Sequence, residues 1–175
     1  KDAGDQASEN FVSGQDASFY AELYGNAGLK GGHVILLNGA DSPYYEETRK
    51  QALLALHSYP GGLQLGGGIT ADNAARFIEA GASHVIVTSY VFNNGRIDYN
   101  NLEKLVDAVG KSHLVLDLSC RKKDDSYYIV TDRWQKFTDE VITEELLDEL
   151  SQYCDEFLIH AVDVEGKAGG IEKEL

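Results

Sequence analysis

Short, almost purely apolar runs alternate along this chain with segments whose apolar residues recur at helical spacing. The apolar runs cover residues 33–37, 63–65, 84–87, 113–118 and 157–161. Runs without regular polar interruptions are typical of parallel strands that helices cover on both faces. Strands that alternate with helices in this way predict an α/β fold with a parallel sheet.

Helix-capping residues indicate where the helical segments begin. Ser42, with Pro43 at the first helical position, predicts a helix that runs to about residue 57. Within it, Glu46 and Lys50 stand four residues apart, and we expect them to pair. Other helices are predicted at 18–25, 71–80, 98–109 and from 143 onward, with a loop at 1–10 and the start of a further helix at 171–175.

An insertion at residues 120–137 separates the fourth apolar run from the helix that follows it. A polar turn at 123–126 precedes the apolar stretch 127–130, which predicts a hairpin. Insertions after the carboxyl end of a strand are where α/β enzymes build their sites. We therefore search this segment and its neighbours for chemistry.

The number of strand–helix units leaves two architectures open. Five such units fit either an open doubly wound sheet or a (β/α)8 TIM barrel that is incomplete here, since a whole barrel takes about 250 residues. The chain has 175 residues, and we expect a single domain over 1–175.

Charge and cysteine content exclude several classes of partner. The formal net charge is −14 and the pI is near 4.6, whereas proteins that bind duplex nucleic acid need a basic surface. This acidic charge leads us to expect no nucleic acid partner. We also expect no membrane partner, because no apolar run approaches the length of a membrane span. Cys120 and Cys154 lack metal-ligand spacing, so we expect free thiols in a reducing compartment and no metal site.

A glycine turn, Gly66, Gly67 and Gly68, ends the second apolar run and leads into a helix. A strand, a glycine turn and a helix N-terminus together present backbone N–H groups and the positive end of a helix dipole. The next apolar run ends in two hydroxyls, Thr88 and Ser89. These residues predict a phosphate site, although glycines also form tight turns for steric reasons alone.

Candidate acid–base and binding residues cluster after the last two apolar runs. Asp117, near the carboxyl end of a strand, is a candidate to hold or deliver a proton, the alternative being a loop cap. Asp163 and Glu165 follow the next run and could face Asp117. Arg121 could bind a phosphate or tune the acid, and Trp134 could stack on a heterocycle or anchor the hairpin.

Two histidines, His33 and His160, lie on apolar runs. A histidine in such a position is more often a core residue than a ligand or a base. We therefore interpret both as core residues.

Five strings of this sequence resemble the eukaryotic ProFAR isomerases of histidine biosynthesis. They are HVI at 33–35, LGGGI at 65–69, SHVIVTS at 83–89, LDLSCRK at 116–122 and FLIHAVDVEG at 157–166. Strings at 90–95 and 131–137 look most like plant or algal members of that family.

The resemblance implies a (β/α)8 barrel that converts the aminoaldose ProFAR to the aminoketose PRFAR by an Amadori rearrangement. The implied substrate is a small bisphosphate, and neither a metal nor an organic cofactor is needed. Asp117 would be the proton donor, with Glu165 also at the catalytic site. The implied substrate-binding residues are Gly66, Gly67, Gly68, Thr88 and Ser89 for one phosphate and Trp134 for the imidazole carboxamide. We add Arg121 and Asp163 as substrate-binding candidates because of their positions in the sequence.

The same resemblance implies that this chain corresponds to about strands 2 to 6 of a barrel. Strand 1, which carries the family's general base, and strands 7 and 8 have no counterpart, so we expect the chain to be inactive alone. Two alternatives remain: a cyclase-like barrel that makes imidazole glycerol phosphate, against which the tryptophan-bearing insertion argues, and a non-catalytic phosphate-binding module. The family context implies a monomer at full length, in the plastid stroma of a plant or alga and otherwise in the cytoplasm.

Overall fold

The computed structural model describes residues 11–131, 134–167 and 169–175, so the loop expected at 1–10 lies outside the described residues. These residues form two compact units. The first holds the chain up to Ile69 together with Asn73–Val85, and the second holds Thr70–Asp72 together with Ile86–Leu175. Each unit is described by itself below.

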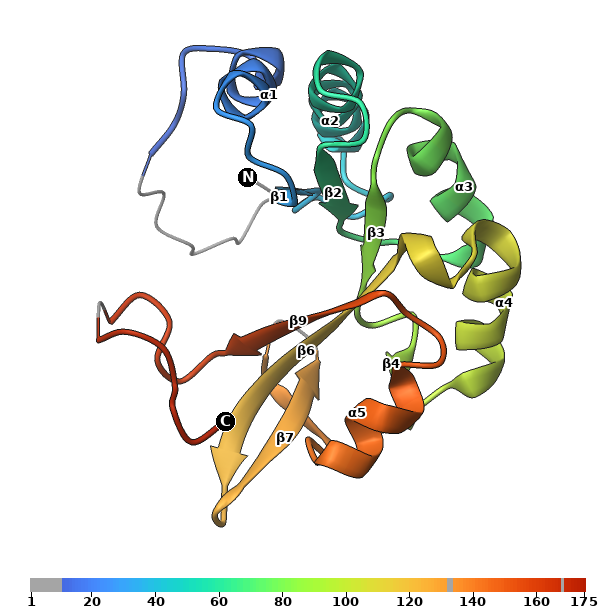
Figure 1. Cartoon of the computed structure of the whole chain (residues 1–175), viewed down its shortest axis with the longest axis vertical. Helices are drawn as coiled ribbons and strands as arrows, with labels where there is room; N and C mark the ends of the chain where they lie inside the picture. The colour runs from blue at the N-terminus through green and yellow to red at the C-terminus, as the bar shows by residue number, and fades with distance from the viewer. Residues whose placement is uncertain (1–10, 132–133, 168) are drawn as a thin grey trace. The chain divides into compact units, whose positions relative to one another are not determined.

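The first unit packs helices against parallel strands, as the apolar pattern predicts. Its elements are α1 (Ala17–Asn26), β1 (Gly32–Ile35), α2 (Tyr45–Ser58), β2 (Leu63–Gly66) and most of α3 (Ala71–Glu79). The strands β1 and β2 pair in parallel, with Val34 opposite Leu65. Helices α1 and α2 lie side by side (Figure 1), and the N–H of Ala17 donates to Gln51 Oε1 at 2.9 Å.

The start of α2 differs from the sequence-based prediction. The helix begins at Tyr45, and its N-cap position makes no side-chain hydrogen bond. Ser42 Oγ instead accepts a 3.2 Å hydrogen bond from the N–H of Tyr44, because it lies in the turn before the helix. The expected partner of Glu46 is also wrong: Arg49 donates to Glu46 from two nitrogens, at 3.2 and 2.9 Å. An arginine one turn away offers this forked geometry, which a lysine lacks.

The second unit is built around one long strand. It contains β4 (Phe92–Asn93), β5 (Arg96–Ile97), α4 (Tyr99–Val109), β6 (Leu114–Lys123), β7 (Ser126–Thr131), β8 (Lys136–Val141), α5 (Glu144–Leu150) and β9 (Glu156–Ala161), and β3 (His84–Val87) enters it at Ile86. Asp98 and Thr143 cap α4 and α5 as predicted, each accepting from a backbone N–H. The strands β6 and β9 pair in parallel (Figure 1).

The segment predicted as a hairpin contains one, formed by the end of β6 and by β7, which pair antiparallel. Cys120 pairs with Ala161 of β9 on one side and with Ile129 of β7 on the other. The turn between β6 and β7 holds Asp124 and Asp125 at φ of 49° and 64°, a left-handed pair that suits a tight hairpin. A third strand, β8, which the sequence pattern did not predict, pairs antiparallel with β7.

Residues 171–175 contain no helix, contrary to the sequence-based expectation. A five-residue segment is too short for a helix to be stable without packing, because nucleation is costly. Glu174 of this segment forms an ion pair with Lys122 of β6 instead. The alternation of strands and helices elsewhere confirms the predicted α/β class.

Candidate functional site

Asp117 is the half-buried carboxylate in the apolar part of β6. Leu116 and Leu118 on either side of it are fully buried, and the alternation of a strand turns Asp117 to the opposite face. Thr88 Oγ1 donates to Asp117 Oδ2 at 3.2 Å, and Ser119 Oγ donates to Oδ1 at 2.7 Å. Both carboxylate oxygens are therefore held by hydroxyl groups, which fix the orientation of the acid.

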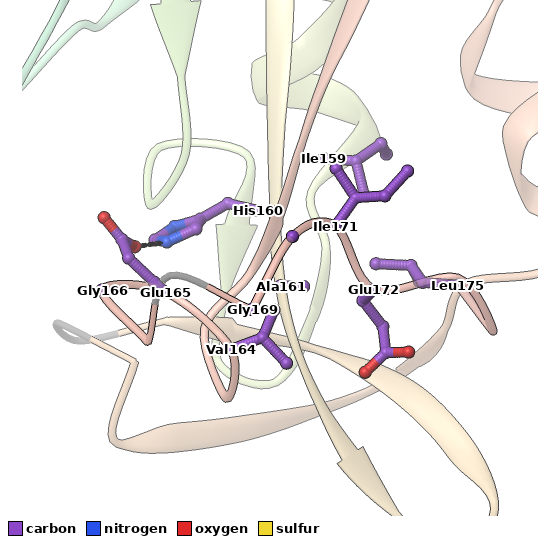
Figure 2. A pocket seen from close by; sticks show the side chains of 11 residues that line it. Ile159, His160, Ala161, Val164, Glu165, Gly166, Gly169, Ile171, Glu172 and Leu175 are labelled. Carbon is purple, nitrogen blue, oxygen red and sulfur yellow. Dashed lines mark ion pairs between the residues drawn. The ribbon is translucent and has the colours of Figure 1, made fainter.

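His160 continues this hydrogen-bonded group on the neighbouring strand. It lies directly opposite Ser119 in the parallel ladder between β6 and β9. Ser119 Oγ and His160 Nδ1 are 3.1 Å apart. His160 Nε2 forms an ion pair with Glu165, which Figure 2 marks with a dashed line. A continuous chain of polar contacts thus runs from Asp117 to Glu165.

Trp134 covers the histidine from the turn between β7 and β8. Its ring meets the ring of His160 edge to face, with centroids 5.1 Å apart and planes at 81°. The residue remains 44% exposed, so part of the ring is accessible. An accessible aromatic ring can stack on a planar ligand.

Arg121 and Asp163 pair with each other. Arg121 Nε donates to Asp163 Oδ1 at 2.9 Å, and the N–H of Lys122 donates to Oδ2 at 3.1 Å. Partial burial opposes ionisation of Asp163, but these two hydrogen bonds outweigh it and hold its pKa below the ordinary value. Asp163 therefore ties the loop after β9 to the end of β6.

A pocket of about 550 Å³ lies beside β9, and it overlaps the hydrogen-bonded group only through His160 and Glu165. Ile159 and His160 point to opposite sides of the strand, and Ile171 and Leu175 lie on the side of Ile159 (Figure 2). Neither Asp117 nor Trp134 lines this pocket. We therefore place the candidate chemistry at Asp117 and not in this pocket.

The predicted phosphate loop, in the first unit, has a steric reason for its central glycine. Gly67 has φ of 100°, and a Cβ there would lie 2.2 Å from the carbonyl oxygen of Leu36 after β1. Gly68 has φ of 65° but open space around the same position. The side chain of Asn73 donates to the carbonyl of Gly68 at 2.9 Å and holds the turn. Gly66 is the last residue of β2, where its carbonyl accepts from Leu36 N at 2.8 Å.

Thr88 and Ser89 separate in the second unit. Thr88 contacts Asp117, as described above. Ser89 is exposed and lines a polar hollow of about 320 Å³ with Asn93, Asn94 and Lys136 among others. The contacts of Thr88 with Asp117 and of His160 with Glu165 were not predicted from the sequence, which grouped Thr88 with Ser89 and placed Glu165 opposite Asp117.

His160 is the site residue that the sequence reading missed. We expected a core histidine, but its side chain is 23% exposed and has polar contacts on both ring nitrogens. The apolar run ends at Leu118, so the hydrophobic pattern does not indicate that the strand continues through Ser119, opposite His160. The sequence does contain one signal, the hydroxyl of Ser119 two residues after Asp117. If the strand continues, Asp117 and Ser119 lie on the same face of it.

This group of side chains is suited to moving a proton. It contains a carboxylate whose oxygens accept hydroxyl hydrogens, an imidazole within contact of the nearer hydroxyl, and an exposed aromatic ring. Such an arrangement fits general acid catalysis on a planar substrate. Among the described helices, none is long and apolar enough to span a membrane.

Comparison with known proteins gives a consistent picture. A 1-(5-phosphoribosyl)-5-((5-phosphoribosylamino)methylideneamino)imidazole-4-carboxamide isomerase of Medicago truncatula, named as chloroplastic, is 58% identical over 99% of this chain and 54% of its own length. Isomerases of the same name from Debaryomyces hansenii and Saccharomyces cerevisiae are 46% and 42% identical over 95% of the chain, which covers 62% and 61% of them.

The chain thus spans about half of the plant relative and less than two thirds of the fungal ones. A family model described as "Histidine biosynthesis protein" matches residues 2–175. This chain therefore belongs to the histidine biosynthesis protein family, whose fold is the (β/α)8 barrel.

Proposed function

We propose that the protein containing this chain is an aldose–ketose isomerase of histidine biosynthesis, which converts ProFAR to PRFAR. The relatives described above carry the name of this isomerase. The observation that carries the proposal is the carboxylate of Asp117, held by two hydroxyls at 3.2 and 2.7 Å. An acid fixed in this way is suited to donate a proton at one defined position of a bound sugar.

In this proposal Asp117 protonates the ring oxygen of the aminoaldose. The C–O bond breaks, its electron pair goes to the oxygen, and a Schiff base forms. A base then removes the proton from C2 to give the enolamine, which becomes the ketone. We assign this base to a part of the full-length protein that this chain does not span.

The remaining predicted residues take binding roles. The exposed ring of Trp134 stacks on the imidazole carboxamide. The glycine turn at Gly66–Gly68 binds a phosphate through backbone N–H groups. The hydroxyls of Thr88 and Ser89 are also substrate-binding groups. Arg121, already paired with Asp163, shapes the loop that carries Glu165 rather than binding a phosphate directly.

We also propose a plastid location if the source is a plant or an alga. The Medicago truncatula relative is named as chloroplastic, which supports this location. The proposal further includes a small bisphosphate substrate and a monomer at full length.

Product identification with the purified full-length protein tests the function. We expect ProFAR to give PRFAR without added ammonia. Chromatography should separate the product from the substrate, and mass spectrometry should show that the two have the same mass. Formation of imidazole glycerol phosphate from PRFAR and ammonia would instead make the protein a cyclase. Tight binding of the bisphosphate without any product would make it a binding module.

A further inference from the structure

The polar contacts from Asp117 to Glu165 form one unbranched chain through Ser119 and His160. Ser119 Oγ lies 2.7 Å from Asp117 Oδ1 and 3.1 Å from His160 Nδ1, and Glu165 contacts His160 Nε2. Ser119 is 1% exposed, so water does not compete for its hydroxyl. The register of β6 and β9 sets this geometry, because Ser119 and His160 are ladder partners.

Counting hydrogens shows that the chain has two forms with the same positions of carbon, nitrogen and oxygen. Ser119 has one hydroxyl hydrogen and can donate it to only one neighbour. If it donates to an ionised Asp117, His160 Nδ1 must carry a hydrogen and donate to Ser119. If Asp117 is protonated and donates to Ser119, the hydroxyl donates to a bare Nδ1. In both forms Nε2–H faces Glu165, so the forms differ by the transfer of one proton.

We propose that His160 is a positioning residue that resupplies Asp117 with its proton through Ser119, an inference that rests on the proposed isomerase function. Starting from the form with an ionised Asp117, the hydroxyl proton of Ser119 moves to Asp117 Oδ1, and Asp117 can then give a proton to the ring oxygen. The Nδ1 proton of the imidazolium moves to Ser119 Oγ, and the imidazole becomes neutral. The neutral imidazole has to regain one proton at Nδ1 before the next turnover, so one proton enters for each that the substrate takes.

The groups around His160 come from β6, from the loop after β9 and from the β7–β8 turn. Ser119 and, through it, Asp117 face the ring from β6, and Glu165 faces it from the loop after β9. Trp134 contacts it from the turn between β7 and β8 and carries no charge. Among the described residues, the nearest cation along β6, Arg121, is paired with Asp163. The charged group in direct contact with the ring is therefore the carboxylate of Glu165, and Asp117 lies one hydroxyl further along the chain.

Kinetics of the full-length isomerase test the relay. We compare His160→Asn, Ser119→Ala and the double variant with the wild type, and use His57→Asn, an exposed histidine on α2, as the control. Asparagine keeps an N–H near the position of Nδ1 but supplies no proton. We expect each single variant to lose about tenfold or more in kcat, with KM unchanged and His57→Asn like the wild type. The double variant should be no slower than the slower single variant, because the members act as one chain.

The pH profile separates a relay from a purely structural role. Without the imidazolium, Asp117 carries its proton only when the solution supplies it. The kcat of His160→Asn should therefore recover toward the wild type as the pH is lowered. Wild-type kcat in either single variant, additive losses in the double variant, or the same fractional loss at every pH would overturn the proposal.

A measurement without turnover keeps the relay distinct from the proposed function. Nitrogen NMR of labelled histidines in the full-length protein follows the titration of His160. Asp117→Asn removes the group that exchanges a proton with the ring, so the midpoint of the measured His160 titration should differ from that of the wild type. The same substitution in a Ser119→Ala background should leave the midpoint unchanged. Equal shifts in both backgrounds would refute the relay, whereas a protein that shows this coupling but does not convert ProFAR would refute only the function.

Discussion

Trp134 combines an unusual backbone conformation with an accessible side chain. Its φ is 68°, in the left-handed region that a bulky residue rarely adopts. Glycine suits this conformation, so Trp134→Gly removes the ring without disturbing the turn. We predict that Trp134→Gly raises KM by about tenfold, from the loss of one stacked ring, while the melting temperature of the full-length protein does not fall.

Trp134→Phe is the matched control for this substitution, because it keeps an aromatic face. Its KM should lie between those of the wild type and Trp134→Gly. A KM that stays at the wild-type value in Trp134→Gly would remove the stacking role and leave the residue as an anchor of the β7–β8 turn.

The two cysteines are predicted to be unreactive in the folded protein. The pKa of each thiol is raised to about 11, mainly by burial, and the nearby Asp163 and Asp117 contribute to this rise for Cys120. Since the thiolate is the nucleophile, a thiol with a raised pKa reacts slowly near neutral pH. Iodoacetamide followed by peptide mapping of the full-length protein should label Cys120 and Cys154 only after urea is added. Rapid labelling of either peptide in the native protein would contradict this burial.

At the scale of elements, the turn between β2 and α3 contains one glycine that is required for steric reasons, Gly67, and one that is not, Gly68. A methyl group at Gly67 would collide with the backbone of Leu36, whereas one at Gly68 meets open space. We predict that Gly67→Ala costs about 3 kcal/mol in the free energy of unfolding, from overpacking and left-handed strain, and Gly68→Ala about 1 kcal/mol.

Urea unfolding of the two full-length variants measures this difference. Gly68→Ala, which folds more readily, is also the variant for substrate kinetics: a raised KM supports the phosphate role of the turn. Equal destabilisation by the two substitutions would show that the close approach to Leu36 does not constrain Gly67.

The pair Arg121–Asp163 joins β6 to the loop after β9, and its contribution should depend on pH. The folded-state pKa of Asp163 is lowered, so its stabilisation is present above the unfolded-state value of about 3.9. It is lost as the pH falls through the lower folded-state value. We expect Asp163→Asn to cost about 1 kcal/mol or less at pH 7, because both side chains are 41% exposed.

Unfolding free energies measured from pH 7 down to pH 3 test this sign. The gap between the wild type and Asp163→Asn should close as the pH falls. Asp139→Asn serves as the control, because Asp139 and its partner Arg96 are 76% and 78% exposed. This substitution should change the free energy of unfolding by nearly zero at every pH. A gap that widens toward pH 3 would contradict the lowered pKa.

The sequence predicted the elements whose signals are local. The helix from Tyr99 to Val109 has a capping Asp98 and a Gly110 stop, and the structure confirms both. The strand β6 runs five residues further than its apolar core, because pairing with β7 and β9 extends it through polar residues. Such pairing is non-local, so a pattern along one segment does not reveal it. The missed role of His160 has the same cause.

At the scale of the whole molecule, the order of strands and helices left an open sheet and a barrel equally possible. Both architectures use the same local units, and they differ in how distant strands close the sheet. Membership of the histidine biosynthesis family decides for the (β/α)8 barrel. The proposed function likewise rests on Asp117 and its partners together with the relatives, since a fold of this kind hosts many reactions.

The kcat of Asp117→Asn in the full-length protein tests the central claim most directly. Asparagine keeps the shape of the side chain but has no proton to give to the ring oxygen. We predict that kcat for ProFAR conversion falls by about 10²- to 10⁴-fold, with the melting temperature unchanged. Asp107→Asn, the same change at an exposed position on α4, should retain wild-type kcat. An Asp117→Asn variant within about threefold of the wild type would contradict the assignment of Asp117 as the acid.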